Sequence, residues 1–277
     1  EEECRTSDRS SVSPEGEFSY RVKVIGDESG GDIRVYARFD GTGEYGPGER
    51  TIFVPIKRPP GMAIIVAGGN NEKSSELWNQ TNTICNYVYT VVKNQGIPDD
   101  LTEEGKNRIY YLHPDANNDA DNDGVADTDA KPTRANLQKA IQEWALGLVA
   151  VGNDAKKTVT PITVYMMGTG EDDKFGINKT ETVTAKDLSG WLNQLFTEVK
   201  KKHKVDTLPV NVILESPQSG SFIDDLKVKE GVGNGRVVVT STDDGSEDTG
   251  GEINVMGDGA VSFSKQFFYG VKSGRSI

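Results

Sequence analysis

The chain has 277 residues, 35% of them hydrophobic and 8% aromatic, a composition typical of a soluble globular protein with one domain or one domain and a smaller companion. Its formal net charge of −12 would repel a phosphate backbone, so we expect no nucleic-acid partner. Every apolar run is far shorter than the ~20 residues that cross a bilayer, so we expect no membrane span. No basic, apolar leader is visible and the first residue is not Met, which we interpret as a mature form or an excised segment.

The few cysteines and histidines limit the chemistry that the chain can perform. The two cysteines, Cys4 and Cys85, cannot make a disulfide framework. Cys85 lies in a helical pattern that is typical of a buried apolar side chain, although a Cys4–Cys85 bond stays open. The two histidines are His113 and His203, and His203 stands in the solvated stretch KKKHK, so we assign it no role.

Residues 1–60 predict a β-strand-rich unit behind a loose, polar N-terminus. Three segments alternate between apolar and polar residues: FSYRVKVIG (18–26), DIRVYARFD (32–40) and RTIFVPI (50–56). Glycine-rich turns separate them, which is typical of antiparallel strands. A sheet of three strands is thin and needs a partner surface. The stretch KRPPG (57–61) that follows is typical of a linker.

Residues 61–277 show a different pattern, in which strands and helices alternate. Strand patterns lie at 63–69, 109–115, 161–168, 210–216 and 236–242, and helical spacing lies at 74–96, 133–149, 184–203 and 262–271. This alternation predicts an α/β domain with a mostly parallel sheet and helices on both faces. Thr133 and Thr184 are predicted to cap their helices, and Asp187 completes a capping box with Thr184.

Ligands bind at the carboxyl ends of the strands in sheets of this kind, so five loops are candidates for a site. They are residues 68–71, 113–115, 168–173, 215–221 and 241–248.

The order and spacing of the segments resemble the legumain-type cysteine peptidases, and their bacterial members in particular. The matching stretches include AIIVAGG, TRANLQKAIQEWA, TVYMMGTGEDDKFGI and VILESPQSGSFIDDL, and the match covers roughly residues 62–277. The resemblance implies a caspase-like fold for this domain.

The resemblance also implies where catalysis would take place. In the family, a histidine between two glycines follows the third strand, and a cysteine before a Ser-Gly-Ser-like loop follows the fourth. The corresponding positions here hold Thr169, between Gly168 and Gly170, and Pro217. Threonine is no general base near neutral pH, and proline has neither a thiol nor a backbone N–H to hold an oxyanion. We therefore expect no cysteine-peptidase activity.

Other groups offer an alternative chemistry in the same place. Ser216, Ser219 and Ser221 follow the fourth strand, and a serine nucleophile needs a base such as His113, which ends a neighbouring strand. The simpler interpretation is that His113 only packs in its loop.

Carboxylates form a second alternative. Glu171, Asp172 and Asp173 could act with Glu215 as an acid–base couple. The simpler interpretation is a solvated acidic loop beside a strand end.

The stretch DANNDADNDGVADTDA (115–130) has the pattern of a calcium-binding loop. From Asp119 it carries oxygen ligands at positions 1, 3, 5 and 9, and a glycine at position 6 permits a sharp turn. The predicted ligands are Asp119, Asp121, Asp123, the Val125 carbonyl and Asp127. Hard oxygen donors suit calcium, whereas zinc would prefer His or Cys.

The loop departs from a full EF-hand because position 12 is Ala130 and not Glu. Asp129, Asp115 or Asn117 is expected to complete the coordination shell. Without an ion, so many carboxylates in a short loop repel one another. The opposing interpretation is a flexible acidic loop that binds no ion.

These features favour a catalytically inactive, legumain-like pseudopeptidase that serves as a calcium-stabilised structural or binding module of an extracellular or surface assembly. We expect a protein partner or self-association through strand edges of the 1–60 unit. The alternative is a residual hydrolase that uses a serine or a carboxylate in the former cleft. A third hypothesis is a peptide-binding domain that keeps the specificity pocket.

Overall fold

The structure is a computed structural model of the chain. It describes residues 32–39, 48–55, 61–69, 76–97, 99, 107–149, 159–228, 235–244 and 262–272. The chain divides into two compact units, Glu1–Arg58 and Pro59–Ile277.

The N-terminal unit contains a two-stranded antiparallel ribbon. Strand β1 (Asp32–Phe39) pairs with β2 (Gly48–Pro55), in a register that runs from Asp32 opposite Pro55 to Phe39 opposite Gly48. Two of the predicted strands are therefore confirmed as an antiparallel pair, because alternating β-branched and aromatic residues favour extended backbone. The strand predicted at 18–26 lies outside the described residues.

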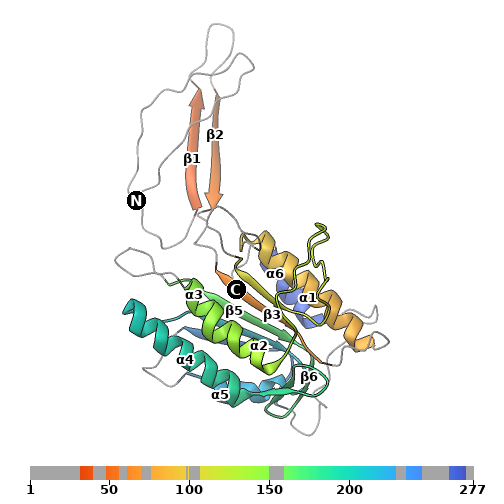
Figure 1. Cartoon of the computed structure of the whole chain (residues 1–277). Helices are drawn as coiled ribbons and strands as arrows, with labels where there is room; N and C mark the ends of the chain where they lie inside the picture. The colour runs from red at the N-terminus through yellow and green to blue at the C-terminus, as the bar shows by residue number, and fades with distance from the viewer. Residues whose placement is uncertain are drawn as a thin grey trace. The chain divides into compact units, whose positions relative to one another are not determined.

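The larger unit is built on a five-stranded parallel sheet (Figure 1). Its strands are β3 (Met62–Ala67), β4 (Ile109–Leu112), β5 (Ile162–Met167), β9 (Val210–Glu215) and β10 (Arg236–Thr240). The order across the sheet is β10-β9-β5-β3-β4, and every neighbouring pair is parallel. The α/β prediction is confirmed, and the layout is that expected of a caspase-like fold.

Helices cover both faces of this sheet, as predicted (Figure 1). Helices α1 (Glu76–Asn94) and α6 (Ser262–Lys272) pack on one face, against side chains such as Ile65. Helix α4 (Ala185–His203) packs on the other face with the 134–148 helix, against side chains such as Ile64. No helix in the described part of the chain is long and apolar enough to cross a membrane.

The helix predicted at 133–149 forms, but not as one regular α-helix. Helix α2 (Arg134–Lys139) passes into a π-helical stretch, η1 (Ala140–Ala145), and ends in α3 (Leu146–Leu148). Thr133 is the N-cap, as predicted, and its side chain accepts the Asn136 N–H at 3.2 Å. The π stretch was not predicted, because apolar spacing over two turns does not distinguish the two helical periods.

A small antiparallel sheet after β5 was also missed, because the sequence favoured a loop at 168–173. Strands β6 (Thr169–Glu171), β7 (Lys174–Gly176) and β8 (Thr182–Thr184) form it. Each strand has only three residues, too few for a pattern, and the fully buried Phe175 anchors the sheet to the core. A 3₁₀ turn, η2 (Ser219–Ser221), and helix α5 (Phe222–Leu226) follow β9.

Helix α4 begins with the predicted capping box. The Thr184 hydroxyl accepts the Asp187 N–H at 3.1 Å, and the Asp187 carboxylate accepts the Thr184 N–H at 3.2 Å. The helix ends where Lys204 takes a left-handed conformation, with φ at 57°. The box satisfies two backbone N–H groups that the helix cannot bond internally.

Replacing Thr184 by alanine should lower the free energy of unfolding by about 1 kcal/mol, because the Asp187 N–H loses its acceptor. Urea unfolding measures this change. Thr197→Ala is the matched control, since Thr197 is exposed within the same helix, where alanine is the better helix former. An equal loss in both variants would contradict the assignment of the cap.

Candidate functional site

The positions that would hold a dyad lie at the adjacent ends of β5 and β9. Met167 stands opposite Glu215 in the sheet, and the Gly168 N–H donates to the Glu215 carbonyl at 3.1 Å. Just beyond, Gly170 lies so close to the next loop that a Cβ there would be 2.4 Å from the Pro217 carbonyl oxygen. Strand pairing therefore brings Gly170 against residues 216–217, although 47 positions separate 170 from 217 in the sequence.

The 216–221 loop is held by a network of hydrogen bonds. The Thr242 hydroxyl donates to the Ser216 carbonyl at 3.1 Å and accepts the Ser219 N–H at 2.9 Å. The Gly220 N–H donates to the Asp243 carbonyl at 3.0 Å. Gln218 is in a left-handed conformation, with φ at 54°. The loop is thus tied to the chain that follows β10.

Thr169 and Pro217, the positions that the predicted resemblance assigns to a dyad, carry neither a base nor a thiol. Pro217 supplies no nucleophile and no N–H, and Thr169 supplies a hydroxyl that does not titrate near neutral pH.

The serines of this loop are not joined to a base. Ser216 Oγ is buried without a hydrogen-bond partner among the described residues. Ser219 Oγ lies 3.1 Å from Thr242 Oγ1, and Ser221 Oγ donates to the Gln218 carbonyl at 2.7 Å. None of these contacts activates a hydroxyl as a nucleophile.

His113, the candidate base, is engaged elsewhere. Its Nε2 lies 2.7 Å from Asn82 Oδ1 on α1, and its Nδ1 lies 3.1 Å from the Asp115 carbonyl. The ring is 2% exposed and packs against Trp78 and Tyr111. Burial lowers the pKa of His113, which keeps the imidazole neutral. The contacts are those of a histidine packed in its loop.

The carboxylates of the second alternative lie in different environments. Glu215 is completely buried, and burial raises its pKa to about 7. Glu171, Asp172 and Asp173 are exposed, and Glu171 lies 3.7 Å from Lys174. A glycosidase-like couple needs both groups to face one substrate, and this arrangement does not provide that.

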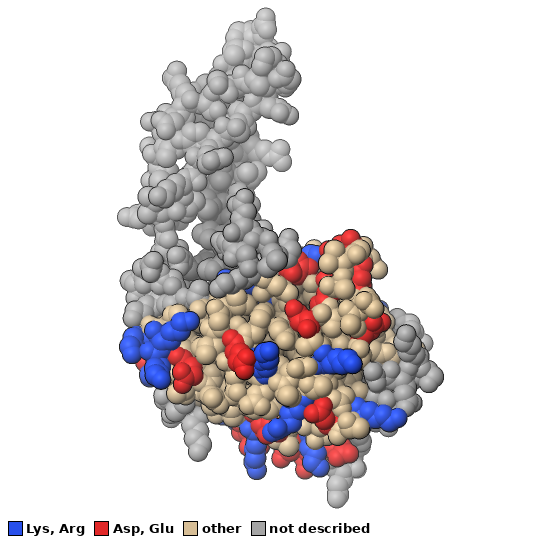
Figure 2. Space-filling model, in the orientation of Figure 1, with Lys and Arg blue, Asp and Glu red and all other residues tan. Residues whose placement is uncertain are grey.

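The acidic loop brings three of its predicted ligands together. Carboxylate oxygens of Asp119, Asp121 and Asp127 all lie within 4.8 Å of one another. Asp123 instead groups with Asp121 and with Asp99, a residue that the sequence pattern did not include. Figure 2 shows acidic side chains gathered over this part of the surface.

The turn of the loop follows the predicted pattern. Gly124 has φ at 90° and Asn122 has φ at 62°, so the backbone turns sharply where the pattern needs it. Asp119 accepts the Gly124 N–H at 2.9 Å and the Asp123 N–H at 3.1 Å. The Val125 side chain is 65% exposed, which leaves this edge of the loop in solvent.

Helix α1 holds the acidic loop through polar side chains. The Tyr89 hydroxyl lies 2.8 Å from Asp127 and 2.9 Å from Asp99. Lys93 bonds to Asp121 and lies 2.7 Å from Asp99 and 3.3 Å from Asp123. Although burial lowers the pKa of Lys93, its bonds to these carboxylates raise it overall. Lys93 therefore neutralises part of the negative charge of the loop.

Sequence analysis missed Tyr89, Lys93 and Asp99. A signal was present in α1, where Asn82, Asn86, Tyr89 and Lys93 form a polar stripe at helical spacing. Asn86 bonds to Asn118 at 3.1 Å, so the stripe follows the loop along the helix. Nothing in the sequence indicated that this stripe would meet the acidic loop.

The end of the loop is part of the sheet edge. The Tyr111 N–H donates to Asp129 Oδ2 at 2.8 Å, and Ala130 bridges to Leu112 as a short parallel pair. The His113 N–H donates to the Ala130 carbonyl at 3.0 Å. Asp129 and Ala130 thus cover the open side of β4, which explains why position 12 carries no ligand side chain.

Two other expected ligands have other partners. Asp115 accepts the Asn117 N–H on its side chain at 2.9 Å, and its carbonyl accepts the Thr128 hydroxyl at 2.7 Å. Asn117 is exposed. Neither residue lies in the groups of carboxylates described above.

The donor set fits a hard divalent cation. Burial raises the pKa of Asp127, and the charges of Asp121 and Asp123 act in the same direction, against the N–H of Ala120 and the hydroxyl of Tyr89. A divalent ion would relieve this repulsion, and clustered carboxylate oxygens suit calcium.

A hollow of about 160 Å³ opens at the carboxyl end of β3. It is lined by Ala67, Gly69, Pro114, Lys131, Pro132, Thr133 and Asn178. Since β4 lies on one side of β3 and β5 on the other, the hollow is at the switch point where open α/β sheets bind ligands. Gly69 also lies against Thr169, so the hollow borders the former dyad. Its size suits one side chain and not a drug-sized molecule.

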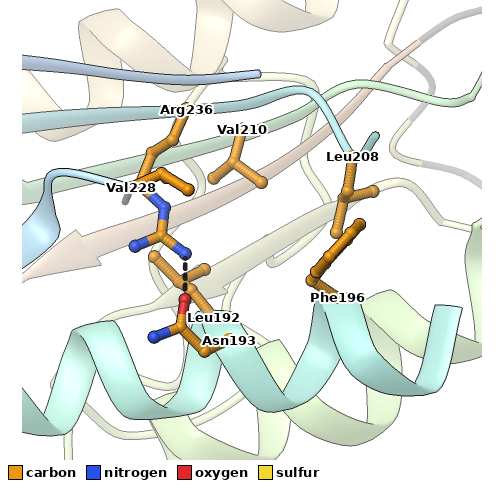
Figure 3. A pocket seen from close by; sticks show the side chains of 7 residues that line it. All are labelled: Leu192, Asn193, Phe196, Leu208, Val210, Val228 and Arg236. Atoms are coloured by element: carbon orange, nitrogen blue, oxygen red, sulfur yellow. Dashed lines mark hydrogen bonds between the residues drawn. The ribbon is translucent and has the colours of Figure 1, made fainter. Parts of the chain in front are cut away.

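A second hollow lies between α4 and the edge of the sheet (Figure 3). Arg236 reaches into it, donating to Asn193 Oδ1 at 3.0 Å and to the Leu226 carbonyl at 3.1 Å. Its Nε is buried without a partner among the described residues. The free volume of about 10 Å³ admits a single water molecule at most, so this is a packing defect and not a ligand site.

A scan of the sequence against protein-family models found no match, and a search of curated proteins found none either.

Replacing Gly170 by alanine should lower the free energy of unfolding by roughly 1–3 kcal/mol, because the new methyl group would overlap the Pro217 carbonyl. Chemical unfolding measures this change. Gly190→Ala is the matched control, since a Cβ at this position meets nothing within 4 Å. This substitution replaces a glycine within a helix, so it should raise the free energy of unfolding by about 0.5–1 kcal/mol. A neutral Gly170→Ala would contradict the close approach of β6 to this loop.

Proposed function

We propose that this protein is a catalytically inactive, legumain-like pseudopeptidase that acts as a calcium-stabilised structural or binding module in an extracellular or surface assembly. The observation that carries the proposal is the close approach of Gly170, the neighbour of Thr169, to residues 216–217 at the ends of β5 and β9. The positions that the resemblance assigns to the base and the nucleophile are Thr169, next to this contact, and Pro217, within it, and neither residue supplies such a group.

The packing around these positions supports a role without turnover. His113 is bonded to Asn82 and to its own loop, so it does not replace the missing base. The hollow beside Gly69 supports a binding role, because it could receive one side chain of a protein partner next to the former dyad.

The calcium part of the proposal rests on the acidic loop. Asp119, Asp121 and Asp127 would hold the ion, with Asp123 and the Val125 carbonyl as further ligands. Because the loop is bonded to α1 and its end covers the edge of β4, an ion there would stabilise the domain and not only the loop.

Location and partners follow from this site as part of the same proposal. Sites of this kind in extracellular modules bind calcium at roughly 10⁻⁴–10⁻³ M, a concentration that is found outside cells. The β-rich unit at 1–60 would contribute strand edges for pairing with a protein partner or a second copy of the chain.

The wild-type protein should not cleave a mixed-sequence peptide library, as read by mass spectrometry of the products. Residual hydrolysis that Ser216→Ala or Ser219→Ala abolished would overturn the proposal in favour of a serine hydrolase. Hydrolysis lost in Glu215→Gln would favour the carboxylate alternative.

The former dyad can be rebuilt as a positive control, in a background with Cys4 replaced by serine. The Thr169→His, Pro217→Cys variant should react with iodoacetamide at pH 6 roughly tenfold faster than Pro217→Cys alone, because a nearby imidazolium lowers the thiol pKa. Cys85 is fully buried and should not react. Equal rates in the two variants would show that positions 169 and 217 do not face each other.

Calcium should raise the midpoint temperature of unfolding relative to EDTA. At 100 times its dissociation constant, calcium should add about 2.7 kcal/mol to the free energy of unfolding. Differential scanning calorimetry over a calcium titration measures this. Asp119→Asn, Asp121→Asn should remove the effect, whereas Asp224→Asn, Asp225→Asn, which changes the charge equally on α5, should keep it. If calcium does not stabilise the wild type, both the proposed calcium site and the extracellular location inferred from it are wrong.

A further inference from the structure

A buried polar cluster lies between the sheet and α6, away from the acidic loop. It consists of Glu215 at the end of β9, Tyr165 on β5, Ser264 on α6 and Cys85 on α1. All four residues are completely buried. The proposed function uses none of them, so a separate account is needed for a carboxyl group in the core.

Glu215 joins α6 to the sheet through hydrogen bonds. The Ser264 hydroxyl bonds to Glu215 Oε2, and the Tyr165 hydroxyl lies 3.3 Å from the same oxygen. The two hydroxyls also lie 2.8 Å from each other, so the three groups form a closed network. Ser264 is the member of this network that belongs to α6.

The network suits a protonated carboxyl better than a carboxylate. Glu215 Oε1 is buried with no hydrogen-bond partner, and no cation of the described residues forms an ion pair with Glu215. The other titratable groups that face it are Tyr165 and Cys85, which would both be anionic if ionised. Burial with Oε1 unpaired disfavours a carboxylate, and it outweighs the hydrogen bonds from the Ser264 hydroxyl, the Ser264 N–H and the Tyr165 hydroxyl, which favour the ionised form.

Apolar packing also holds helix α6 on the domain, since Phe263 and Phe267 pack against the same core as its buried residues. It has 11 residues, and helices this short are marginal in water without tertiary contacts. Phe268 and Val271 are its buried apolar side chains, with Phe268 edge-on to Tyr165 at 5.3 Å, and Gln95 donates to the Val271 carbonyl at 3.1 Å. Tyr269, on its outer side, is 64% exposed. The buried network therefore adds a polar attachment to the apolar packing that holds α6.

We propose that Glu215, Tyr165 and Ser264 form a pH-sensitive latch, which holds α6 on the sheet while the Glu215 carboxyl is protonated and weakens as the pH rises toward neutrality. Opening of the latch uncovers the apolar surface of β5 and β9 that α6 covers. The proposal does not depend on the calcium site or on the loss of peptidase activity.

The direction of the effect follows from proton linkage. Burial raises the pKa of Glu215 from its ordinary value of 4.5 to about 7 when α6 is closed, so the closed state binds the proton more tightly. The contribution of the latch is fully present below pH 4.5 and is lost progressively up to pH 7, with little change above it. The closing equilibrium of α6 should thus fall about 40-fold between pH 5 and pH 7, and by less than about twofold from pH 7 to pH 8.

Hydrogen–deuterium exchange of residues 262–272 in the full chain tests the latch, after correction for the intrinsic pH dependence of exchange. In the wild type, the protection of α6 should fall with pH as described. Glu215→Gln keeps the shape of the side chain without a titrating proton, so its α6 protection should not depend on pH. Glu143→Gln, at an exposed site on the opposite face of the sheet, should behave as the wild type does.

Two results would overturn the latch. The first is α6 protection that falls with pH equally in the wild type and in Glu215→Gln. The second is a Glu215 carboxyl that titrates near 4.5 in the wild type, as followed by its ¹³C chemical shift. The second measurement needs no variant, so the proposal stays testable if Glu215→Gln does not fold. Coincidence of the carboxyl midpoint with the loss of α6 protection would support it.

Discussion

The parallel pairing of β5 with β9 is the constraint on which the rest of this structure depends. It sets Met167 opposite Glu215, so the loops that leave the two strands begin side by side. One of them turns into the small β6–β8 sheet, and the other turns through Pro217 into α5. A glycine at 170 is required because these two loops nearly touch.

Consecutive residues at the end of β9 are both buried but differ in their hydrogen bonds. Glu215 points into the core, where it meets Tyr165 and Ser264, and its neighbour Ser216 is buried without a partner. Pro217 then turns the chain toward the loop that faces β6. A strand alternates its side chains between two faces, so Glu215 and the loop that begins at Ser216 can meet different neighbours although they are adjacent in the chain.

The acidic loop shows how a local pattern becomes part of the fold. Its carboxylates gather around a turn at Gly124, but its position depends on contacts with α1 and β4. Tyr89 and Lys93 hold it from the helix, and Ala130 joins it to the sheet edge. An ion bound in this loop and the ion pair of Lys93 would compete for Asp121, so the affinity of the site depends on the helix as well as on the loop.

The sequence by itself determined the alternation of strands and helices, the caps at Thr133 and Thr184, and the ligand spacing of the acidic loop, because each of these depends on residues within one or two turns of each other. It also placed Thr169 and Pro217 at strand ends. Only the tertiary structure decided which side chains contact one another across the fold, since these contacts join residues far apart in the chain. It bonded His113 to Asn82 and not to a serine, it brought Lys93 to the acidic loop, and it buried Glu215 under α6. Local patterns carry no information about these neighbours, because packing alone selects them.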